Sequence, residues 1–224
     1  MPPLPDVSPV TETETHKFLT QCHLWTAVCL LGLSLGQQLG RYMLSFVLRH
    51  VFSTSVILAL CFAVAPTWYY ARAYRRKTAT EGEKRHLLLA TAVGVGLLTG
   101  HLTAHLILST APPAFLLPLC MGLVAGTVGP TLGKDRRLLV GASVGLGVAL
   151  FLLGSVLFRC FSLPYLLWTA WLGAGAAVQL QFNIHYAKKG ALGAAFPPFV
   201  ALFTFLAVQT LCNGVFGGRP PPEQ

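Results

Sequence analysis

Charged residues are scarce in this sequence, and acidic residues are the scarcest of them. Of the 224 residues, 10% are charged and 54% are hydrophobic, whereas soluble domains carry roughly 25% charged residues. The charges fall in short clusters between long apolar runs, which are typical of membrane-spanning segments. The composition therefore predicts an integral membrane protein. It excludes a soluble enzyme, a secreted disulfide scaffold and a free nucleic-acid-binding domain.

Paired cysteines, glycosylation acceptors and nucleic-acid-binding motifs are also missing. The six cysteines lie in or beside apolar runs and form no C-x-x-C pair, so neither a zinc site nor a disulfide framework is expected. Neither Asn183 nor Asn213 begins an N-x-[ST] acceptor. The net charge of +9 fits the loop lysines and arginines of a membrane protein. No basic face with a recognisable motif indicates a nucleic-acid partner.

Seven apolar segments follow a polar, proline-containing start. We expect a disordered cytosolic tail over residues 1–21, a seven-span domain over 22–214 and a short Pro/Gly-rich tail over 215–224. The first tail lacks the basic start and cleavage site of a secretory signal. The predicted fold is an all-α polytopic membrane protein, a seven-helix transmembrane bundle whose partner is the lipid bilayer.

Each segment is long enough to cross about 30 Å of hydrocarbon. Four prolines predict that the fourth segment is broken or shortened, because proline interrupts a helix unless neighbouring groups satisfy the freed carbonyls. The segments cover residues 22–39, 51–71, 87–109, 112–132, 138–158, 161–183 and 192–214.

Lys and Arg are distributed unevenly between the two sides of this topology. Twelve of the 16 lie in the N-terminal tail and in the second, fourth and sixth loops. Because cytosolic loops carry the excess of Lys and Arg, the N-terminus is predicted to be cytosolic. The second loop holds the largest group, a candidate cytosolic contact surface made of Arg72, Arg75, Arg76, Lys77, Lys84 and Arg85.

No apolar segment contains Asp or Glu. Intramembrane carboxylates mark proton relays and cation sites, so their absence argues against a carboxylate-gated transporter, a pump and a hard-cation site. No cofactor or metal is expected. The polar side chains that remain predict interhelical hydrogen bonds, with a water-filled pathway as the alternative. The candidates are His101, His105, Gln179, Gln181 and Asn183; Gln37, Gln38 and Gln209 also lie in apolar segments.

Glycines recur at four-residue spacing in several segments. Such ridges let helices approach closely, and we expect packing within the chain, with a dimer face as the alternative. The ridges are Gly32–Gly36–Gly40, Gly96–Gly100, Gly122–Gly126 and Gly141–Gly145.

One stretch, Gly141 to Gly145, matches the G-x-S-x-G letters of a serine hydrolase. A nucleophile elbow needs a strand before the serine and a helix after it, whereas Ser143 lies inside an apolar segment. A remote alternative is an intramembrane hydrolase in which His101 or His105 activates Ser143. No catalytic residue is assigned, and we expect no enzyme.

Four stretches in this order, between about His16 and Asn213, resemble the Bax inhibitor-1 (transmembrane Bax-inhibitor-motif) family, including its divergent cytomegalovirus-type viral members. They are Glu83–Leu89, Leu97–Gly100, Ala111–Phe115 and Lys134–Arg137. The resemblance implies seven spans, a cytosolic N-terminus, an endoplasmic reticulum or other endomembrane location, and a leak-type ion channel that modulates calcium homeostasis and cell death (apoptosis regulation).

The pattern departs from that family at its gate. The family carries an aspartate at the place of Gln179, with the matching glutamine at Gln181, and a second aspartate in the last helix near Val200 or Thr204. The resemblance therefore implies conduction of calcium or other cations without an acidic gate, along Gln179, Gln181 and Thr204.

A second hypothesis, of a different class, is a non-conducting membrane scaffold or trafficking adaptor. Its cytosolic basic loop would contact membrane-protein partners, while the missing acids and the glycine ridges favour a packed bundle without a pore. The basic loop has a simpler interpretation as an orientation anchor that attracts anionic lipid headgroups.

Overall fold

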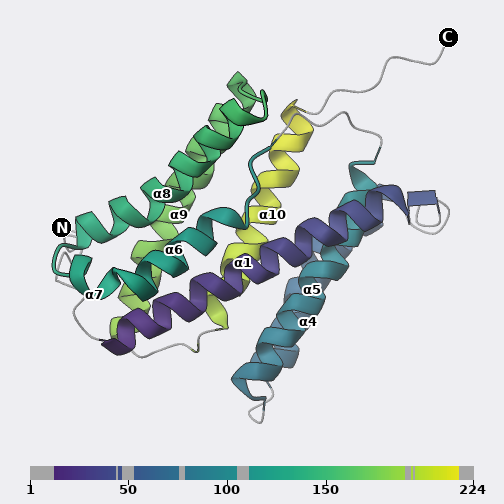
Figure 1. Cartoon of the computed structure of the whole chain (residues 1–224). Helices are drawn as coiled ribbons and strands as arrows, with labels where there is room; N and C mark the ends of the chain where they lie inside the picture. Colours follow the sequence, from purple (N-terminus) through teal and green to yellow (C-terminus); the bar gives the residue numbers. More distant parts are fainter. Residues whose placement is uncertain are drawn as a thin grey trace, which may run out of the picture. The chain divides into compact units, whose positions relative to one another are not determined.

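The computed structural model describes residues 13–43, 45–46, 53–75, 79–104, 111–189, 193 and 195–216. All regular structure in these ranges is helical (Figure 1), which confirms the all-α prediction. Most of the two predicted tails, residues 1–12 and 217–224, lies outside the described residues. The chain divides into two compact units. Unit 1 comprises Met1–Ala27 and Ala111–Pro198, and unit 2 comprises Val28–Thr110 and Phe199–Gln224.

Unit 1 contains the start of α1 and four further helices. α1 begins nine residues before the predicted 22–39 segment because its first turns are amphipathic: Thr15 and His16 are buried, whereas Glu14 and Lys17 form an exposed ion pair of 2.8 Å. The helices are α1 (Thr13–Tyr42), α6 (Leu116–Thr127), α7 (Gly129–Leu132), α8 (Arg136–Leu157) and α9 (Leu163–Lys189).

The fourth predicted segment is broken, as its prolines indicate. Pro112 and Pro113 precede α6, and Pro130 lies at the start of the four-residue α7. The two short helices are separated at Val128, so α6 keeps only 12 residues. α8 follows at once, because the side chain of Asp135 accepts hydrogen bonds from the first free backbone amides of that helix.

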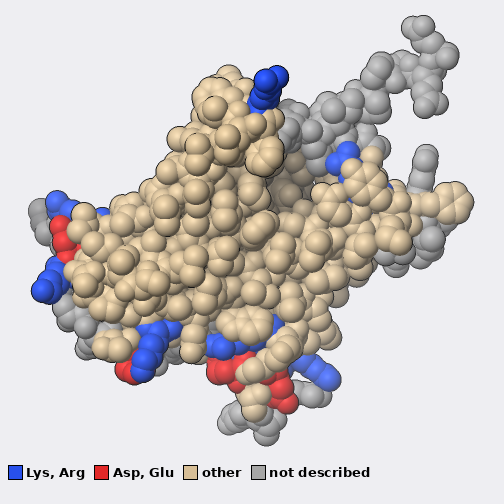
Figure 2. Space-filling view, viewed as in Figure 1, with Lys and Arg blue, Asp and Glu red and all other residues tan. Residues whose placement is uncertain are grey.

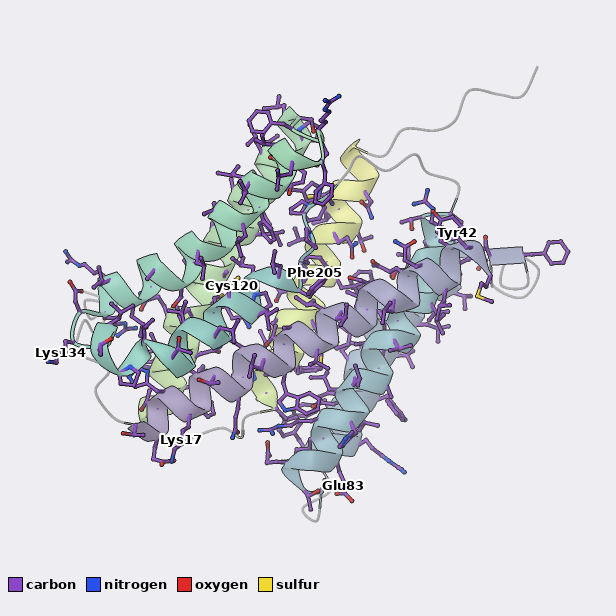
Figure 3. All side chains as sticks on the ribbon, in the orientation of Figure 1. Lys17, Tyr42, Glu83, Cys120, Lys134 and Phe205 are labelled. Carbon is purple, nitrogen blue, oxygen red and sulfur yellow. The ribbon has the colours of Figure 1, made fainter. Side chains whose placement is uncertain are left out.

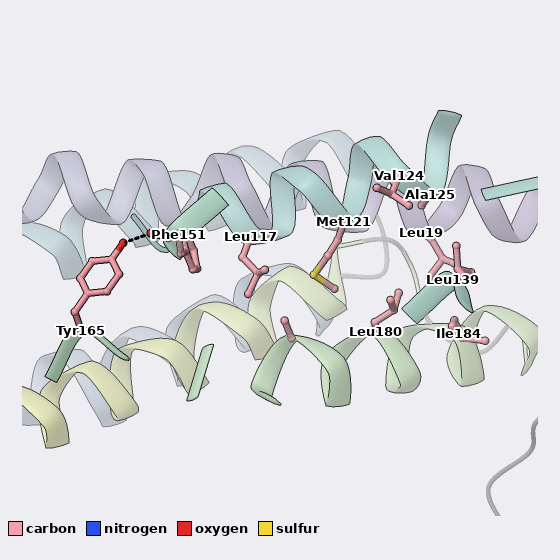
Figure 4. Packing of buried hydrophobic residues seen from close by; sticks show 11 residues of the cluster. Leu19, Leu117, Met121, Val124, Ala125, Leu139, Phe151, Tyr165, Leu180 and Ile184 are labelled. Carbon is pink, nitrogen blue, oxygen red and sulfur yellow. Dashed lines mark hydrogen bonds between the residues drawn. The ribbon is translucent and has the colours of Figure 1, made fainter. Parts of the chain in front are cut away.

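The core of unit 1 is made of large apolar side chains from four helices (Figure 4). The phenol of Tyr165 on α9 donates a hydrogen bond of 2.9 Å to the carbonyl oxygen of Phe151 on α8, which links the two ends of the helices near their connection. The buried cluster comprises Leu19, Leu117, Met121, Val124, Ala125, Leu139, Phe151, Tyr165, Ala176, Leu180 and Ile184.

Unit 2 contains the second half of α1, the helical run from Thr54 to Tyr74, α5 and most of α10. The run from Thr54 widens into one π-helical stretch just before Pro66, with the Ala65 amide donating to the carbonyl of Leu60. Proline cannot donate a hydrogen bond, and its ring would clash with the carbonyl four residues earlier, so the wider turn accommodates it. The elements are α3 (Thr54–Ala59), η1 (Leu60–Val64), α4 (Ala65–Tyr74), α5 (Glu81–Leu102) and α10 (Phe196–Phe216).

Glycines bring the backbones of α1 and α5 together in unit 2. A Cβ added at Gly36 would collide with the carbonyl oxygen of Val93, and one added at Gly100 with that of Gln37. A side chain at either position would force the helices apart. This confirms the predicted intramolecular role for the Gly32 to Gly40 ridge and for Gly96–Gly100. The other two ridges belong to unit 1: Gly122 and Gly126 pack on Leu24 and Thr20, whereas nothing lies within 4 Å of a Cβ at Gly141 or Gly145.

Four helices in the described ranges are long and apolar enough to cross a membrane, rather than the predicted seven. α6 has only 12 residues, α5 begins with four charged residues among its first five, and α9 carries Gln179, Gln181 and Asn183 in its second half. On the face that Figure 2 shows, Lys, Arg, Asp and Glu lie near the edges, and the broad surface between them is uncharged. The four helices are Thr13–Tyr42, Thr54–Tyr74, Arg136–Leu157 and Phe196–Gly214.

Candidate interaction surface at the basic hairpin

The helices α4 and α5 of unit 2 form a hairpin whose tip carries the predicted basic loop; we call residues 72–85 the basic hairpin. Thr80 caps α5 by accepting a hydrogen bond of 3.3 Å from the Glu83 amide, and Glu83 accepts one of 2.8 Å from the Thr80 amide. This reciprocal capping box satisfies two backbone donors at the helix start. It explains why α5 begins at Glu81, ahead of the predicted segment at 87, and it fixes the direction in which the chain leaves the loop.

Aromatic side chains support the hairpin from below. Tyr69 is fully buried and stacks on Phe199 at the start of α10, with ring centroids 4.9 Å apart. Its hydroxyl donates to the carbonyl oxygen of Lys84 across the hairpin at 3.4 Å. Tyr70 stacks on Tyr74 at 5.5 Å. Packed aromatic side chains of α4 and α10 therefore support the tip of the hairpin.

The charged side chains on the hairpin differ in exposure and in whether they form an ion pair. Lys84 forms an ion pair of 2.7 Å with Glu81 and lies 5.2 Å above the ring of Tyr74, and Arg85 is half-buried. Arg72 and Arg75 are exposed. Planar guanidinium groups bind carboxylates in a bidentate manner, so these two arginines suit an acidic partner. Figure 3 labels Glu83 at the tip; Arg76 and Lys77 lie outside the described residues.

The predicted polar-interior residues fall into both units and form several separate contacts. In unit 1 the amide nitrogen of Asn183 lies 3.4 Å from Nε2 of His23, and both side chains are fully buried. The half-buried Gln181 is close to Arg136, which donates to its carbonyl oxygen at 3.5 Å. Gln179 is also half-buried on α9, one helical turn before Asn183.

In unit 2, Nδ1 of His101 lies 3.2 Å from the hydroxyl of Ser45. Thr204 on α10 is exposed, and His105 lies outside the described residues. These contacts are interhelical hydrogen bonds of the kind expected inside a bundle. The proposed line of Gln179, Gln181 and Thr204 is not assembled in either unit, because Thr204 belongs to unit 2 and the glutamines to unit 1.

The strongest polar pair of unit 2 was not among the candidate pathway residues. Gln37 on α1 and Gln209 on α10 exchange two amide hydrogen bonds, of 2.8 and 3.2 Å, and Gln37 also donates to the hydroxyl of Thr99 on α5 at 3.3 Å. The sequence places both glutamines in apolar segments, but it does not show that these segments are neighbours. His23 was missed for the same reason.

The serine-hydrolase alternative gains no support from local geometry. Ser143 is buried in the middle of α8 in unit 1 and follows no strand, so the strand–turn–helix elbow is not formed. His101 belongs to unit 2 and His105 is outside the described residues. Among the described residues, no three His, Cys, Asp or Glu side chains gather where they could hold a metal ion.

A family model described as "Interactor of ZYG-11" matches residues 2–219. No curated protein matches the chain, and no solved structure does.

The resemblance to Bax inhibitor-1 proteins is therefore wrong, and the calcium-leak, ion-channel, cell-death and viral expectations that it implied are withdrawn with it. The positions of three of the four stretches in the fold explain why they resembled that family. Glu83–Leu89 and Lys134–Arg137 lie at the starts of α5 and α8, and Ala111–Phe115 directly precedes α6. Capping residues, prolines and basic residues at such places are common to helical membrane proteins of many families. Because the family model covers nearly the whole chain, the protein belongs to the family described as the interactor of ZYG-11.

Proposed function

We propose that this chain is an integral membrane protein that binds a ZYG-11 protein through the basic hairpin and serves as a non-conducting adaptor. The family match over residues 2–219 carries the proposal, because the family is named for that interaction. It agrees with the adaptor hypothesis drawn from the basic loop and the missing intramembrane acids. No reaction is assigned to the chain.

A membrane location is supported by the four long apolar helices and by large apolar side chains that face outward. On α8, for example, Leu138, Leu153 and Val156 are each more than half exposed. A contiguous exposed apolar surface of this kind is unusual in soluble monomers and normal toward lipid. The exposed Trp68 and Tyr70 precede Arg72 on α4, and aromatic side chains of this type concentrate at membrane interfaces.

Contacts between helix ends support the proposal that the chain crosses the membrane seven times. In unit 1, His16 near the start of α1 packs against Gly129 of α7, and Arg136 at the start of α8 contacts Gln181 near the end of α9. All four residues lie in, or within four residues of, the N-terminal tail and the loops predicted on the cytosolic side. Figure 3 labels Lys17 and Lys134 toward this end of the unit. In unit 2, Tyr69 in the middle of α4 stacks on Phe199 near the start of α10.

We therefore propose that α5, α6 and α9 also lie in the membrane, packed on the more apolar helices. The N-terminus and the basic hairpin face the cytosol, and the location is an endomembrane. A hairpin on the cytosolic side would be accessible to a cytosolic partner, which the adaptor role requires.

The binding proposal is tested by capture of a purified ZYG-11 protein from the same organism on the full chain in lipid nanodiscs. The test variant is Arg72→Glu/Arg75→Glu. The matched control is Lys134→Glu/Arg137→Glu, which makes the same charge change at two exposed basic positions of unit 1. We expect wild type and control to capture the protein and the hairpin variant to bind at least about tenfold more weakly, with a marked salt dependence.

Two results would contradict the proposal in different ways. Failure of folded wild-type protein to capture the ZYG-11 protein would remove the partner. Equal binding by the hairpin variant would leave the partner and remove the hairpin as its site.

Orientation is tested separately with a reporter cysteine at Gly82, where an added Cβ meets nothing within 4 Å. We expect a membrane-impermeant maleimide to label Gly82→Cys once the plasma membrane alone is permeabilised, and wild type to give the background. Labelling that needs the internal membranes to be opened would place the hairpin on the wrong side.

A further inference from the structure

We infer that the turn between α8 and α9 is a membrane-anchoring tip, in which Arg159 binds lipid phosphate groups at the interface of the non-cytosolic leaflet. We call residues 157–163 the apolar tip. The inference rests on the proposed membrane location, and it is independent of ZYG-11 binding.

The turn has a defined backbone geometry. The Cys160 amide donates to the carbonyl of Ser155 at 2.9 Å, and the Arg159 amide donates to that of Val156 at 3.2 Å. This pair of hydrogen bonds is the Schellman motif, which closes a helix with one residue in the left-handed conformation. Arg159 is that residue, with φ 53°.

An arginine is unexpected at this position. Glycine usually occupies it, because a residue with a Cβ atom is strained in the left-handed region. Among the described residues other than glycine, Arg159 alone has a positive φ. Residues held in strained backbone conformations cluster at functional sites, which points to a role for the Arg159 side chain. Arg159 is exposed, so its guanidinium is directed to the surroundings of the turn rather than to the core.

Those surroundings are apolar. Leu157, Phe158, Phe161 and Leu163 flank the arginine and are 69%, 81%, 59% and 69% exposed. In water this would be a costly exposure of four large side chains at one turn. At a membrane interface the same set is complementary to its environment, because the apolar groups enter the acyl region and a guanidinium binds phosphate oxygens.

The length of α8 places the tip at an interface. Its 22 residues extend about 33 Å, which matches the hydrocarbon thickness of about 30 Å. The opposite end of α8 carries the exposed Lys134 and Arg137, which the positive-inside rule assigns to the cytosol. The tip therefore reaches the other leaflet, where basic residues of this chain are few. Charge complementarity favours lipid phosphate over an apolar protein surface as the group that Arg159 binds.

The first test identifies the neighbour of the tip directly. A photoreactive benzoylphenylalanine replaces Phe158 in the full chain, with Glu83 at the hairpin tip as the control position. In nanodiscs containing phosphatidylcholine and phosphatidylglycerol, we expect ultraviolet light to add the mass of a phospholipid at position 158 and not at position 83. In native membranes, protein adducts at position 158, or the absence of any lipid adduct, would overturn the inference.

The second test separates strain from anchoring. Arg159→Gly relieves the left-handed strain, so its Tm in lipid-free detergent should equal or exceed that of wild type. Added phosphatidylglycerol should raise the Tm of wild type and of Arg159→Lys, whereas Arg159→Gly should lose most of this rise. An undiminished rise in Arg159→Gly would overturn the role of the arginine. Release of the protein from membranes by alkaline carbonate would contradict the proposed membrane location itself. If the protein stays in the membrane, failure of either test contradicts only the proposed anchoring role of the apolar tip.

Discussion

The two units of this protein hold their helices together in different ways. Unit 1 is filled by large side chains such as Phe151, Met121 and Leu180, which interdigitate between α1, α6, α8 and α9. Unit 2 instead brings two backbones into direct contact, with Gly36 and Gly100 facing carbonyl oxygens of the opposite helix. A reciprocal glutamine pair then links this crossing to α10.

The difference has a physical origin in the membrane setting proposed for the chain. Lipid tails are as apolar as leucine, so helices in lipid associate through van der Waals packing and hydrogen bonds rather than through the hydrophobic effect. Side-chain packing can adjust to a changed volume by rotamer movement. Backbone contact over glycine cannot, because there is no side chain to move. Unit 2 should therefore be less tolerant of substitution at its contact positions than unit 1.

The largest effect is expected from Gly100→Leu in unit 2. The new side chain would meet the backbone of Gln37, with the Gln37 Cα 2.7 Å from the added Cβ, so the cost should exceed the 1–3 kcal/mol that is roughly typical of overpacking. We expect no folded protein by size-exclusion chromatography in mild detergent. Gly94→Leu on the same helix is the control, since nothing lies within 4 Å of its Cβ. Equal loss in both variants would show that the close backbone contact at Gly100 is not the cause.

The next effect is expected in the side-chain core of unit 1. Phe151→Ala should lower the free energy of unfolding by roughly 3–5 kcal/mol, because it leaves a cavity where the ring is buried. Met121→Leu conserves volume and should cost less than about 1.5 kcal/mol. Both are measured by equilibrium unfolding in mixed micelles. A cost for Met121→Leu comparable to that of Phe151→Ala would mean that unit 1 is as intolerant as unit 2.

A smaller effect is expected from the glutamine pair. A double-mutant cycle with Gln37→Leu and Gln209→Leu should give a coupling energy of at least about 0.6 kcal/mol, the average for interhelical hydrogen bonds in membranes, and at most about 1.7 kcal/mol, the largest value found for them. The same unfolding assay measures it. Additive single substitutions would show that the two amides do not stabilise each other.

The smallest effect is expected at a glycine of unit 2 that makes no close contact. Gly94→Ala should stabilise α5 by at most about 1 kcal/mol, because alanine has the higher helix propensity and the site is open. Destabilisation at Gly94 would reveal a partner for that face of the helix.

Local features of the fold could be predicted from the sequence. The prolines around α6 interrupt the helix locally, and the spacing of Gly96 and Gly100 places both on one helix face. Both effects depend only on the nearby chain or on helix geometry. The start of α5 was misplaced because the capping box of Thr80 and Glu83 extends the helix into charged residues that hydropathy assigns to the loop.

Long-range features could not be predicted. The pairing of Gln37 with Gln209 joins segments 172 residues apart, and that of His23 with Asn183 joins segments 160 apart. The spacing of residues along the sequence does not show which helices are neighbours in the fold. The division of α1 between the two units, at Ala27, is invisible for the same reason. The family was misjudged because helix-end residues report on membrane topology and not on descent.

Docking of a ZYG-11 protein on the basic hairpin can be measured by the protection of single cysteines from labelling. Gly82→Cys reports on the hairpin of unit 2, and Lys134→Cys reports on an exposed basic position of unit 1. Maleimide labelling rates are measured in nanodiscs with and without a saturating ZYG-11 protein. We expect slower labelling at position 82 and an unchanged rate at position 134. Unchanged labelling at position 82 while the ZYG-11 protein is bound would contradict docking on the hairpin.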